Sequence, residues 1–264
     1  MQYILNIDMK EIFNTMFLFT LLAVTGSCSN EDMVPVNGEQ KAGKVVIRSY
    51  NALQDSVQIV VNGKPLEIGT HDAFVKRIVK DYEFVFYDNQ EKNIEIINKA
   101  TREKLHSYNF SPHFPVDTLS FYHKDGMWID DVLASRPGTL SATGRTGYRF
   151  IFPTMNRYSN SGYDGPVDAI ITKVNGQLMG IAENITKENF SPFVEFAYGA
   201  PPILQVELVK HGTQESYING QQVIIQMVMQ NNKSRLIVLD EKANVDGSFS
   251  GVDGTINLAD YFDF

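Results

Sequence analysis

The residues that could do chemistry are mainly histidines and carboxylates, and their spacing fits none of the common catalytic centres. A zinc hydrolase places two histidines four residues apart on one helix face, and no two histidines here have that spacing. The chain also lacks a Gly-x-Ser-x-Gly nucleophile turn, a phosphate-binding loop and a dinucleotide-binding glycine pattern. We therefore expect no catalysis and no cofactor, and we interpret the five histidines as scattered polar groups: His71, His106, His113, His123 and His211.

Two acidic stretches need separate consideration. Asp130 and Asp131 are adjacent, so in a strand their side chains point to opposite faces and cannot form the facing pair of a glycoside hydrolase. Residues 246–254 contain some oxygen ligands of a calcium loop but lack acids at alternate positions and a closing glutamate. They predict a glycine-rich turn before a last strand, and we expect no metal site.

The single cysteine, Cys28, has a position that indicates lipidation. It follows an apolar run, residues 16–24, which is too short to span a bilayer but fits the core of a signal peptide. Small residues, 25–27, lie between the two. This order resembles the bacterial lipoprotein signal, in which the cysteine is lipidated and becomes the first mature residue. The polar segment 29–32 is similar to the surface-export tag of Bacteroidota lipoproteins, which implies a lipid-anchored, surface-exposed protein of the outer membrane.

The start of the signal peptide has two interpretations. Residues 1–8 carry no positive charge, whereas Met9-Lys10 makes a better opening, so either Met1 or Met9 could be the initiator. We predict a signal peptide over 1–27 and a tether over 28–43, because the tether contains Pro, Gly and charge without periodicity.

Composition and charge limit the partners. The chain is 43% hydrophobic and 20% charged, which is typical of a globular protein. Its formal charge of −8 argues against nucleic acid and against anionic lipid headgroups. Attachment to a membrane would then depend on the lipid on Cys28. The sequence does not determine the oligomeric state.

Alternating apolar and polar residues predict an all-β chain. Residues 44–50 and 57–61 alternate, and Asn62-Gly63 then predicts a tight hairpin turn. Residues 70–80 fit either a strand, over 73–79, or a short helix that begins at Thr70. The other runs are 82–88, 93–98, 117–124, 127–132, 148–152, 167–174, 192–197, 203–210, 222–229 and 235–240.

The two halves of the chain repeat one another. Similar segments occur in the same order on both sides of a small, polar, glycine-rich linker over 135–147. They predict two tandem β-sandwich domains, immunoglobulin-like or transthyretin-like, over 44–134 and 148–264. The matched segments are 60–66 with 173–178, 73–75 with 192–194, 82–86 with 204–208, and 118–122 with 235–239.

The first of these domains resembles a widespread family of uncharacterised β-sandwich lipoprotein domains. The resemblance covers about residues 44–122 and consists of a first strand, a short loop, a strand that ends in a Gly turn, and an aromatic-rich pair. It implies an extracytoplasmic module and no particular chemistry.

The two halves differ most between their first two strands. The gap is short in the first half, residues 51–55, and long in the second, residues 154–166. Exposed tyrosines and amides in such a loop could stack on a sugar or peptide and hydrogen-bond to it. The alternative is a solvated loop with one tyrosine folded onto the sandwich. The candidate ligand-binding residues are Tyr158, Tyr163, Asn156, Asn160 and Asp164.

The only tryptophan, Trp128, lies in a predicted strand, where we expect it in the core or a domain interface and not as a sugar platform.

The sequence thus favours a non-catalytic surface lipoprotein that captures a glycan or another extracellular ligand beside an outer-membrane transporter. The alternative is a structural or adhesive subunit, or the anchor, of a fimbria-like assembly that uses β-strand addition. The acidic C-terminal segment, 255–264, supports neither class over the other.

Overall fold

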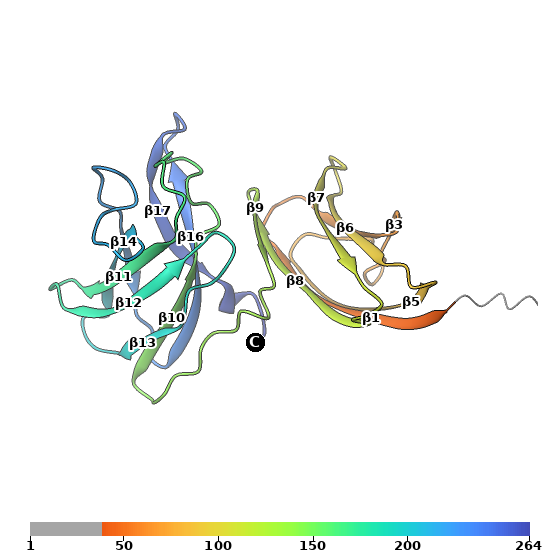
Figure 1. Ribbon diagram of the computed structural model, residues 1–264, viewed down its shortest axis with the longest axis horizontal. Coiled ribbons are helices and arrows are strands. Elements are labelled where there is room, and N and C mark those ends of the chain that lie inside the picture. The colour runs from red at the N-terminus through yellow and green to blue at the C-terminus, as the bar shows by residue number, and fades with distance from the viewer. Residues whose placement is uncertain (1–38) are drawn as a thin grey trace, which may run out of the picture.

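The computed structural model describes residues 39–264 and shows an all-β protein, as the sequence predicts (Figure 1). The predictions of the signal peptide, of its start and of the lipidated Cys28 lie outside the described residues, as does the tether up to residue 38. Besides the strands, residues 39–264 contain one short 3₁₀ helix, η1 (Leu258–Asp260). Within residues 39–264 no helix is long and apolar enough to cross a membrane.

Two sheets form the first sandwich. One has the order β5-β1-β8-β9 and contains β1 (Gln40–Asn51), β5 (Arg77–Tyr87), β8 (Val116–Lys124) and β9 (Met127–Asp130). The other has the order β3-β2-β6-β7, and β4 also pairs with β2; it contains β2 (Val57–Val61), β3 (Lys64–Pro65), β4 (Ala73–Phe74), β6 (Lys92–Asn98) and β7 (Lys104–Phe110). Buried side chains of both sheets, such as Ile47, Ile59 and Ile96, meet in one core.

Two further sheets form the second sandwich. One has the order β13-β10-β16-β17 and contains β10 (Arg145–Ile151), β13 (Val194–Ala197), β16 (Lys233–Ala243) and β17 (Phe249–Asn257). The other has the order β12-β11-β14-β15 and contains β11 (Val167–Lys173), β12 (Leu178–Ile185), β14 (Ile203–Lys210) and β15 (Ile224–Val228). Phe150, Val206 and Ile225 are among the side chains of its core.

The same strand topology occurs twice. β1 pairs antiparallel with β5 and parallel with β8, just as β10 pairs antiparallel with β13 and parallel with β16. The matches of 60–66 with 173–178 and of 118–122 with 235–239 therefore join equivalent strands. The match of 82–86 with 204–208 is wrong, because β6 and not β5 is the equivalent of β14. The match of 73–75 with 192–194 is also wrong, because β4 pairs with β2 whereas β13 pairs with β10. Apolar alternation matches any strand to any other, which explains both errors.

The local predictions succeed where a specific turn or strong alternation exists. Asn62 and Gly63 have φ angles of 46° and 77°, and they join β2 to β3 as the predicted hairpin turn. Residues 73–79 form neither one strand nor a helix, since β4 ends at Phe74 and β5 begins at Arg77. β1 begins at Gln40, inside the predicted tether, where it pairs with the end of β5. The sequence did not predict β7, β12 or most of β17. The outward residues of β7 are polar, whereas β12 exposes Leu178 and Ile181, so apolar residues do not alternate regularly along it.

A third apolar cluster joins the two sandwiches. It contains Tyr122 and Ile129 from β8 and β9, and Ile151 and Val238 from β10 and β16, all buried. Phe262, behind η1, completes the cluster. The chain between the sandwiches therefore connects two bodies that also contact each other directly. Figure 1 shows β9 of the first sandwich on the side that faces the second.

The predicted linker packs against the second sandwich. Arg149 donates through Nη1 to the carbonyl oxygen of Ser135 at 3.0 Å. The ring of Phe193 covers Gly147 so closely that a Cβ there would lie 2.2 Å from the ring. Glu195 accepts a hydrogen bond from the Ser141 N–H at 2.9 Å. β10 begins at Arg145, so the last residues of the predicted linker belong to a strand.

Candidate functional site

The long loop of the second domain, residues 152–166, is built around one buried carboxylate. Glu241 on β16 is 1% exposed. Its Oε2 accepts from the backbone N–H groups of Tyr158, at 2.8 Å, and Ser159, at 3.0 Å. Its Oε1 accepts from the Asn156 N–H at 3.0 Å, from the Ser159 hydroxyl at 2.6 Å and from the Tyr217 hydroxyl at 2.9 Å.

These bonds explain why an acid is buried there. The N–H groups of a loop that pairs with no strand need acceptors, and a carboxylate supplies strong, charge-assisted ones. Within residues 39–264 no cationic side chain forms an ion pair with Glu241, so the hydrogen bonds alone compensate its charge. Its own N–H donates to Thr154 Oγ1 at 2.8 Å. The loop and β16 are thus fixed to each other.

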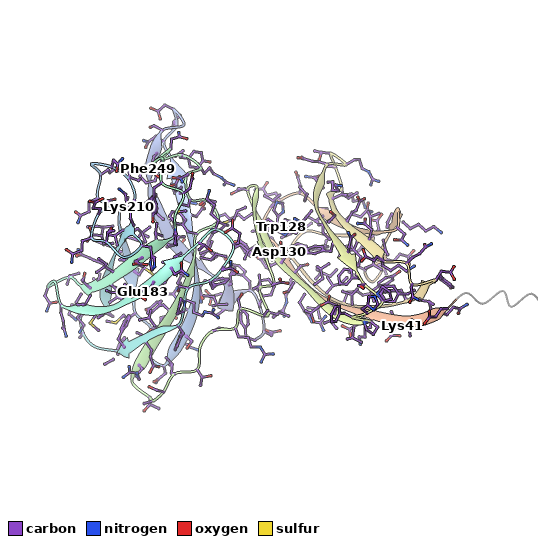
Figure 2. The ribbon with its side chains drawn as sticks, in the orientation of Figure 1. Lys41, Trp128, Asp130, Glu183, Lys210 and Phe249 are labelled. Atoms are coloured by element: carbon purple, nitrogen blue, oxygen red, sulfur yellow. The ribbon has the colours of Figure 1, made fainter. Side chains whose placement is uncertain are left out.

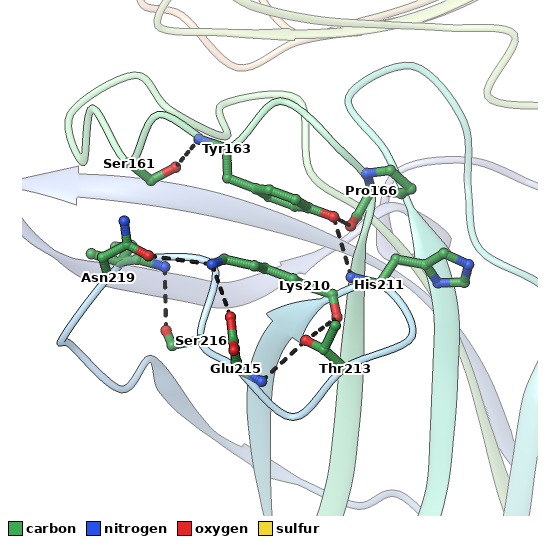
Figure 3. Close-up of polar contacts among 10 residues, drawn as sticks. Ser161, Tyr163, Pro166, Lys210, His211, Thr213, Glu215, Ser216 and Asn219 are labelled. Carbon is green, nitrogen blue, oxygen red and sulfur yellow. Dashed lines mark hydrogen bonds and ion pairs between the residues drawn. The ribbon is translucent and has the colours of Figure 1, made fainter.

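Two of the predicted ligand-binding residues hold the loop together. Asn156, with a φ of 68°, donates through Nδ2 to the Tyr163 carbonyl oxygen at 2.7 Å and accepts from the Ser161 hydroxyl at 2.6 Å. The Tyr163 hydroxyl donates to the Pro166 carbonyl oxygen at 2.7 Å, and Lys210 Nζ lies 5.9 Å from the centre of its ring (Figure 3). Tyr163 is half-buried against the core of the second domain, so its role is largely structural.

The other three predicted residues face solvent to different degrees. Asn160 and Asp164 are exposed, and Tyr158 is half-buried. A stacking platform would need both tyrosines substantially exposed, whereas Tyr158 and Tyr163 are each half-buried in the folded loop. The loop still presents an amide and a carboxylate to solvent on a fixed backbone.

A groove of about 360 Å³ lies beside this loop. One wall is the loop itself, with Met155, Asp164 and Pro166, and the other is the turn after β12, with Thr186, Lys187 and Glu188. The carboxylates of Asp164 and Glu188, the Lys187 ammonium and the Thr186 hydroxyl thus line the groove. Pro166 adds an apolar surface, whereas Met155 is buried. The sequence indicated the first wall through the length of the loop, but nothing distinguished residues 186–188 from an ordinary charged turn.

A His–Asp pair lies next to the base of the loop. His211 Nδ1 is 2.8 Å from Asp168 Oδ1. The His211 N–H donates to the Tyr163 hydroxyl at 3.3 Å, as Figure 3 shows. The hydrogen bond to Asp168, with the charge of that carboxylate, raises the pKa of His211. Burial alone would raise the pKa of Asp168. Hydrogen bonds from the Gly212 N–H, from His211 and from the Asn184 N–H outweigh burial and lower that pKa.

This pair holds a turn in place. A catalytic triad would need a hydroxyl hydrogen-bonded to the other imidazole nitrogen. Within residues 39–264 no serine or threonine hydroxyl forms such a bond to His211. Asp168 also accepts from the Gly212 N–H at 2.9 Å, so the pair fixes the turn after β14 against β11.

The loop also reaches the first domain. Arg157 donates through Nη1 to the carbonyl oxygen of Asp125, in the turn between β8 and β9, at 3.1 Å. The groove therefore belongs to the end of the second domain that lies beside the first.

Trp128 is part of the wall of the first sandwich. Its ring stacks between Phe121, at 4.3 Å between ring centres, and His106, at 4.9 Å. Its Nε1 donates to Asp130 Oδ1 at 2.8 Å (Figure 2). Since both ring faces are covered, Trp128 is not a sugar platform. Asp131 follows the end of β9 in a turn with a φ of 50°, apart from this cluster.

Residues 246–254 form the turn between β16 and β17 and the first part of β17. Asp246 Oδ1 accepts from the Ser248 N–H at 3.0 Å and from its hydroxyl at 2.6 Å, as in an ordinary polar turn. Among residues 39–264 no group of three or more His, Cys, Asp or Glu side chains is placed to hold a metal ion.

Comparisons with known proteins give only distant similarity. No family model matches the sequence, and no curated protein matches it. The Bacillus anthracis TIE protein is similar at a TM-score of 0.24 and 8% identity, over 75% of this chain and 33% of that one, so the chain spans about a third of its length. A family CBM26 module of Eubacterium rectale Amy13K, solved in complex with maltoheptaose, is similar at a TM-score of 0.20 and 11% identity, over 80% of this chain and 93% of that one. Similarity at this level does not establish a shared function.

Proposed function

We propose that this protein is a non-catalytic, lipid-anchored surface protein that captures a carbohydrate in the groove beside the loop 152–166. The observation that carries the proposal is the fixed loop: Glu241 accepts from the backbone N–H groups of Asn156, Tyr158 and Ser159. The loop forms one wall of a groove with convergent polar groups. A ligand that binds a preformed wall does not have to order it, which favours affinity.

The lining of the groove suits a sugar. Hydroxyl groups of a carbohydrate can donate to Asp164 and Glu188 and accept from Lys187, while its C–H faces can pack on Pro166. A volume of about 360 Å³ lies at the small end of the range for ligand sites. A short segment of a glycan therefore fits better than a large folded partner.

The location follows from the predicted lipoprotein signal. We propose that the lipid on Cys28 attaches the chain to the outer membrane and that the second domain offers the groove to the outside. An outer-membrane transporter would be the natural recipient of a captured glycan, because a lipid-anchored protein has no channel of its own.

The fimbrial alternative has less support. A strand-accepting subunit needs an incomplete sandwich with an open apolar groove between its sheets. In residues 39–264 both sandwiches have complete cores, with Ile47 and Ile59 of the first and Phe150 and Val206 of the second fully buried.

The test is a glycan screen followed by titration of the best ligand. Asp164→Ala and Lys187→Ala should each weaken binding at least tenfold, because each removes a directional hydrogen bond in the groove. Glu215→Ala is the matched control, since this exposed carboxylate belongs to the same domain but lies outside the groove. Unchanged affinity in both groove variants, or no binding to any glycan, would contradict the proposal.

A further inference from the structure

A groove of about 570 Å³ lies on the first domain, where the chain enters β1. Ala42, Phe84, Val85 and Pro115 contribute its apolar lining. Three large apolar side chains at this end of the domain are exposed and define what we call the tether-end patch: Tyr87 at 54%, Phe114 at 72% and Val116 at 68% exposed.

Strand pairing places these side chains at one end of the domain. Tyr87 at the end of β5 pairs with Gln40, and Val116 at the start of β8 pairs with Lys44. The Lys44 N–H donates to the Pro115 carbonyl oxygen at 2.7 Å, which holds the residue after Phe114 against β1.

The turn that carries Phe114 is also fixed. The Phe114 N–H donates to the Ser111 carbonyl oxygen at 3.0 Å, and Lys41 donates to the Pro112 carbonyl oxygen (Figure 2 labels Lys41 at this end). A phenylalanine on a fixed turn, with most of its surface exposed, contributes little to the core. Clustered apolar side chains of this kind mark an interaction surface.

The position of the predicted lipid anchor identifies the partner. Only residues 29–38 separate Cys28 from the first described residue, and ten residues span at most about 35 Å in any conformation. A lipid on Cys28 would therefore hold the start of β1, and the patch beside it, close to the bilayer. Figure 1 shows this end of the first domain on the side away from the second domain.

We propose that the tether-end patch rests on the membrane, with Tyr87 and Phe114 at the level of the lipid headgroups. This inference depends on the proposed lipid attachment through Cys28. Aromatic side chains favour this interfacial region, and weak apolar contact adds to the acyl anchor as a second signal. The three side chains of the patch are uncharged, and the nearby Lys44 pairs with Asp81 at 2.7 Å, so a neutral phosphatidylcholine surface should suffice. Lys92 Nζ lies 5.6 Å from the centre of the Tyr87 ring. The first domain then acts as a spacer that keeps the second domain's groove off the bilayer.

The experiment uses the full lipidated protein with Phe114→Trp, reconstituted into phosphatidylcholine vesicles with and without brominated acyl chains. Tryptophan emission in this variant should shift to the blue on reconstitution, and brominated lipid should quench it at least twofold more than in the control. The control is Val228→Trp, which introduces the same probe at a 59% exposed position on β15. Trp128 gives the same background in both proteins.

The outcomes separate the patch from the anchor. If the protein floats with the vesicles but both variants are quenched equally, the patch does not contact the membrane. If the protein carries no lipid and does not float, the anchor is wrong and this inference fails with it. A blue shift of the Phe114→Trp emission that depends on protein concentration without lipid would show that a second copy covers the patch, which would also overturn it.

Discussion

Replacement of Glu241 by glutamine should destabilise the second domain and loosen the loop that it holds. The amide is nearly isosteric, so the change tests the acceptor set and not the packing. One carboxylate oxygen becomes an NH₂ group. The least costly orientation places this NH₂ at Oε1, where the hydroxyls of Ser159 and Tyr217 can rotate to accept from it. The Asn156 N–H cannot rotate, so it would face another donor.

The magnitude follows from these bonds. A buried N–H without an acceptor costs about 1–3 kcal/mol, and bonds to a neutral amide are weaker than bonds to a carboxylate by roughly 1 kcal/mol each. The lower desolvation cost of an amide offsets part of this loss. We expect Glu241→Gln to lower the free energy of unfolding by about 2–4 kcal/mol, which corresponds to a fall in Tm of roughly 4–16 °C.

The assay combines thermal unfolding with hydrogen exchange of the loop. Amides of residues 156–159 should exchange faster in Glu241→Gln, and those of β14 much less so. Glu215→Gln is the matched control, because this carboxylate is 76% exposed and pairs only with Lys210, so its change should cost under about 0.5 kcal/mol. A Glu241→Gln protein as stable as the control, with unchanged loop exchange, would refute the role we assign to Glu241.

Three other predictions test separate parts of the molecule. Cys28→Ala should move the protein from the outer-membrane fraction to a soluble or uncleaved form, and normal fractionation of the variant would refute lipidation. Because the pKa of His211 is raised, its bond to Asp168 stabilises the fold below about pH 6.5, and this stabilisation is lost as pH rises through the folded pKa. Because the pKa of Asp168 is lowered, the stabilisation from its carboxylate is present above about pH 4 and is lost on acidification. The Tm difference between wild type and His211→Gln should thus be largest between about pH 4 and 6.5 and shrink by pH 8, whereas a constant difference would contradict this assignment. Gly147→Ala should displace the Phe193 ring, cost about 1–3 kcal/mol and speed proteolysis within residues 135–144, and an equal cleavage rate would show that the linker does not depend on this packing.

The sequence predicts the sandwich class because its signals are local. Alternation identifies most inner-sheet strands, and Asn62-Gly63 identifies one turn through its positive φ angles. The long loop was also recognisable, because the gap between the first two strands differs between the halves. The edge strand β7 carries polar outward residues, and the edge strand β12 carries apolar residues on both faces, so neither produces a comparable pattern.

The organisation of the candidate site was beyond the sequence. Glu241 lies in Asp240-Glu241-Lys242, which has the composition of an exposed strand end, and its partners in the loop are more than 80 residues away. Burial of such an acid depends on tertiary contacts that no local pattern encodes. The same applies to residues 186–188, which line the groove only when the turn after β12 packs beside the loop 152–166. Tyr163 was recognisable as a loop aromatic, but its bond to Pro166 was not.

The central claim is that a carbohydrate binds in the groove between the loop 152–166 and residues 186–188. The most direct measurement is an NMR titration of the protein with the strongest ligand of a glycan screen, followed at backbone amides. We predict that the shift changes concentrate at residues 155–166 and 186–188 and that Asp164→Ala abolishes them at the same ligand concentration. Changes confined to the outer face of β14 and β15, or to the first domain, would contradict the account.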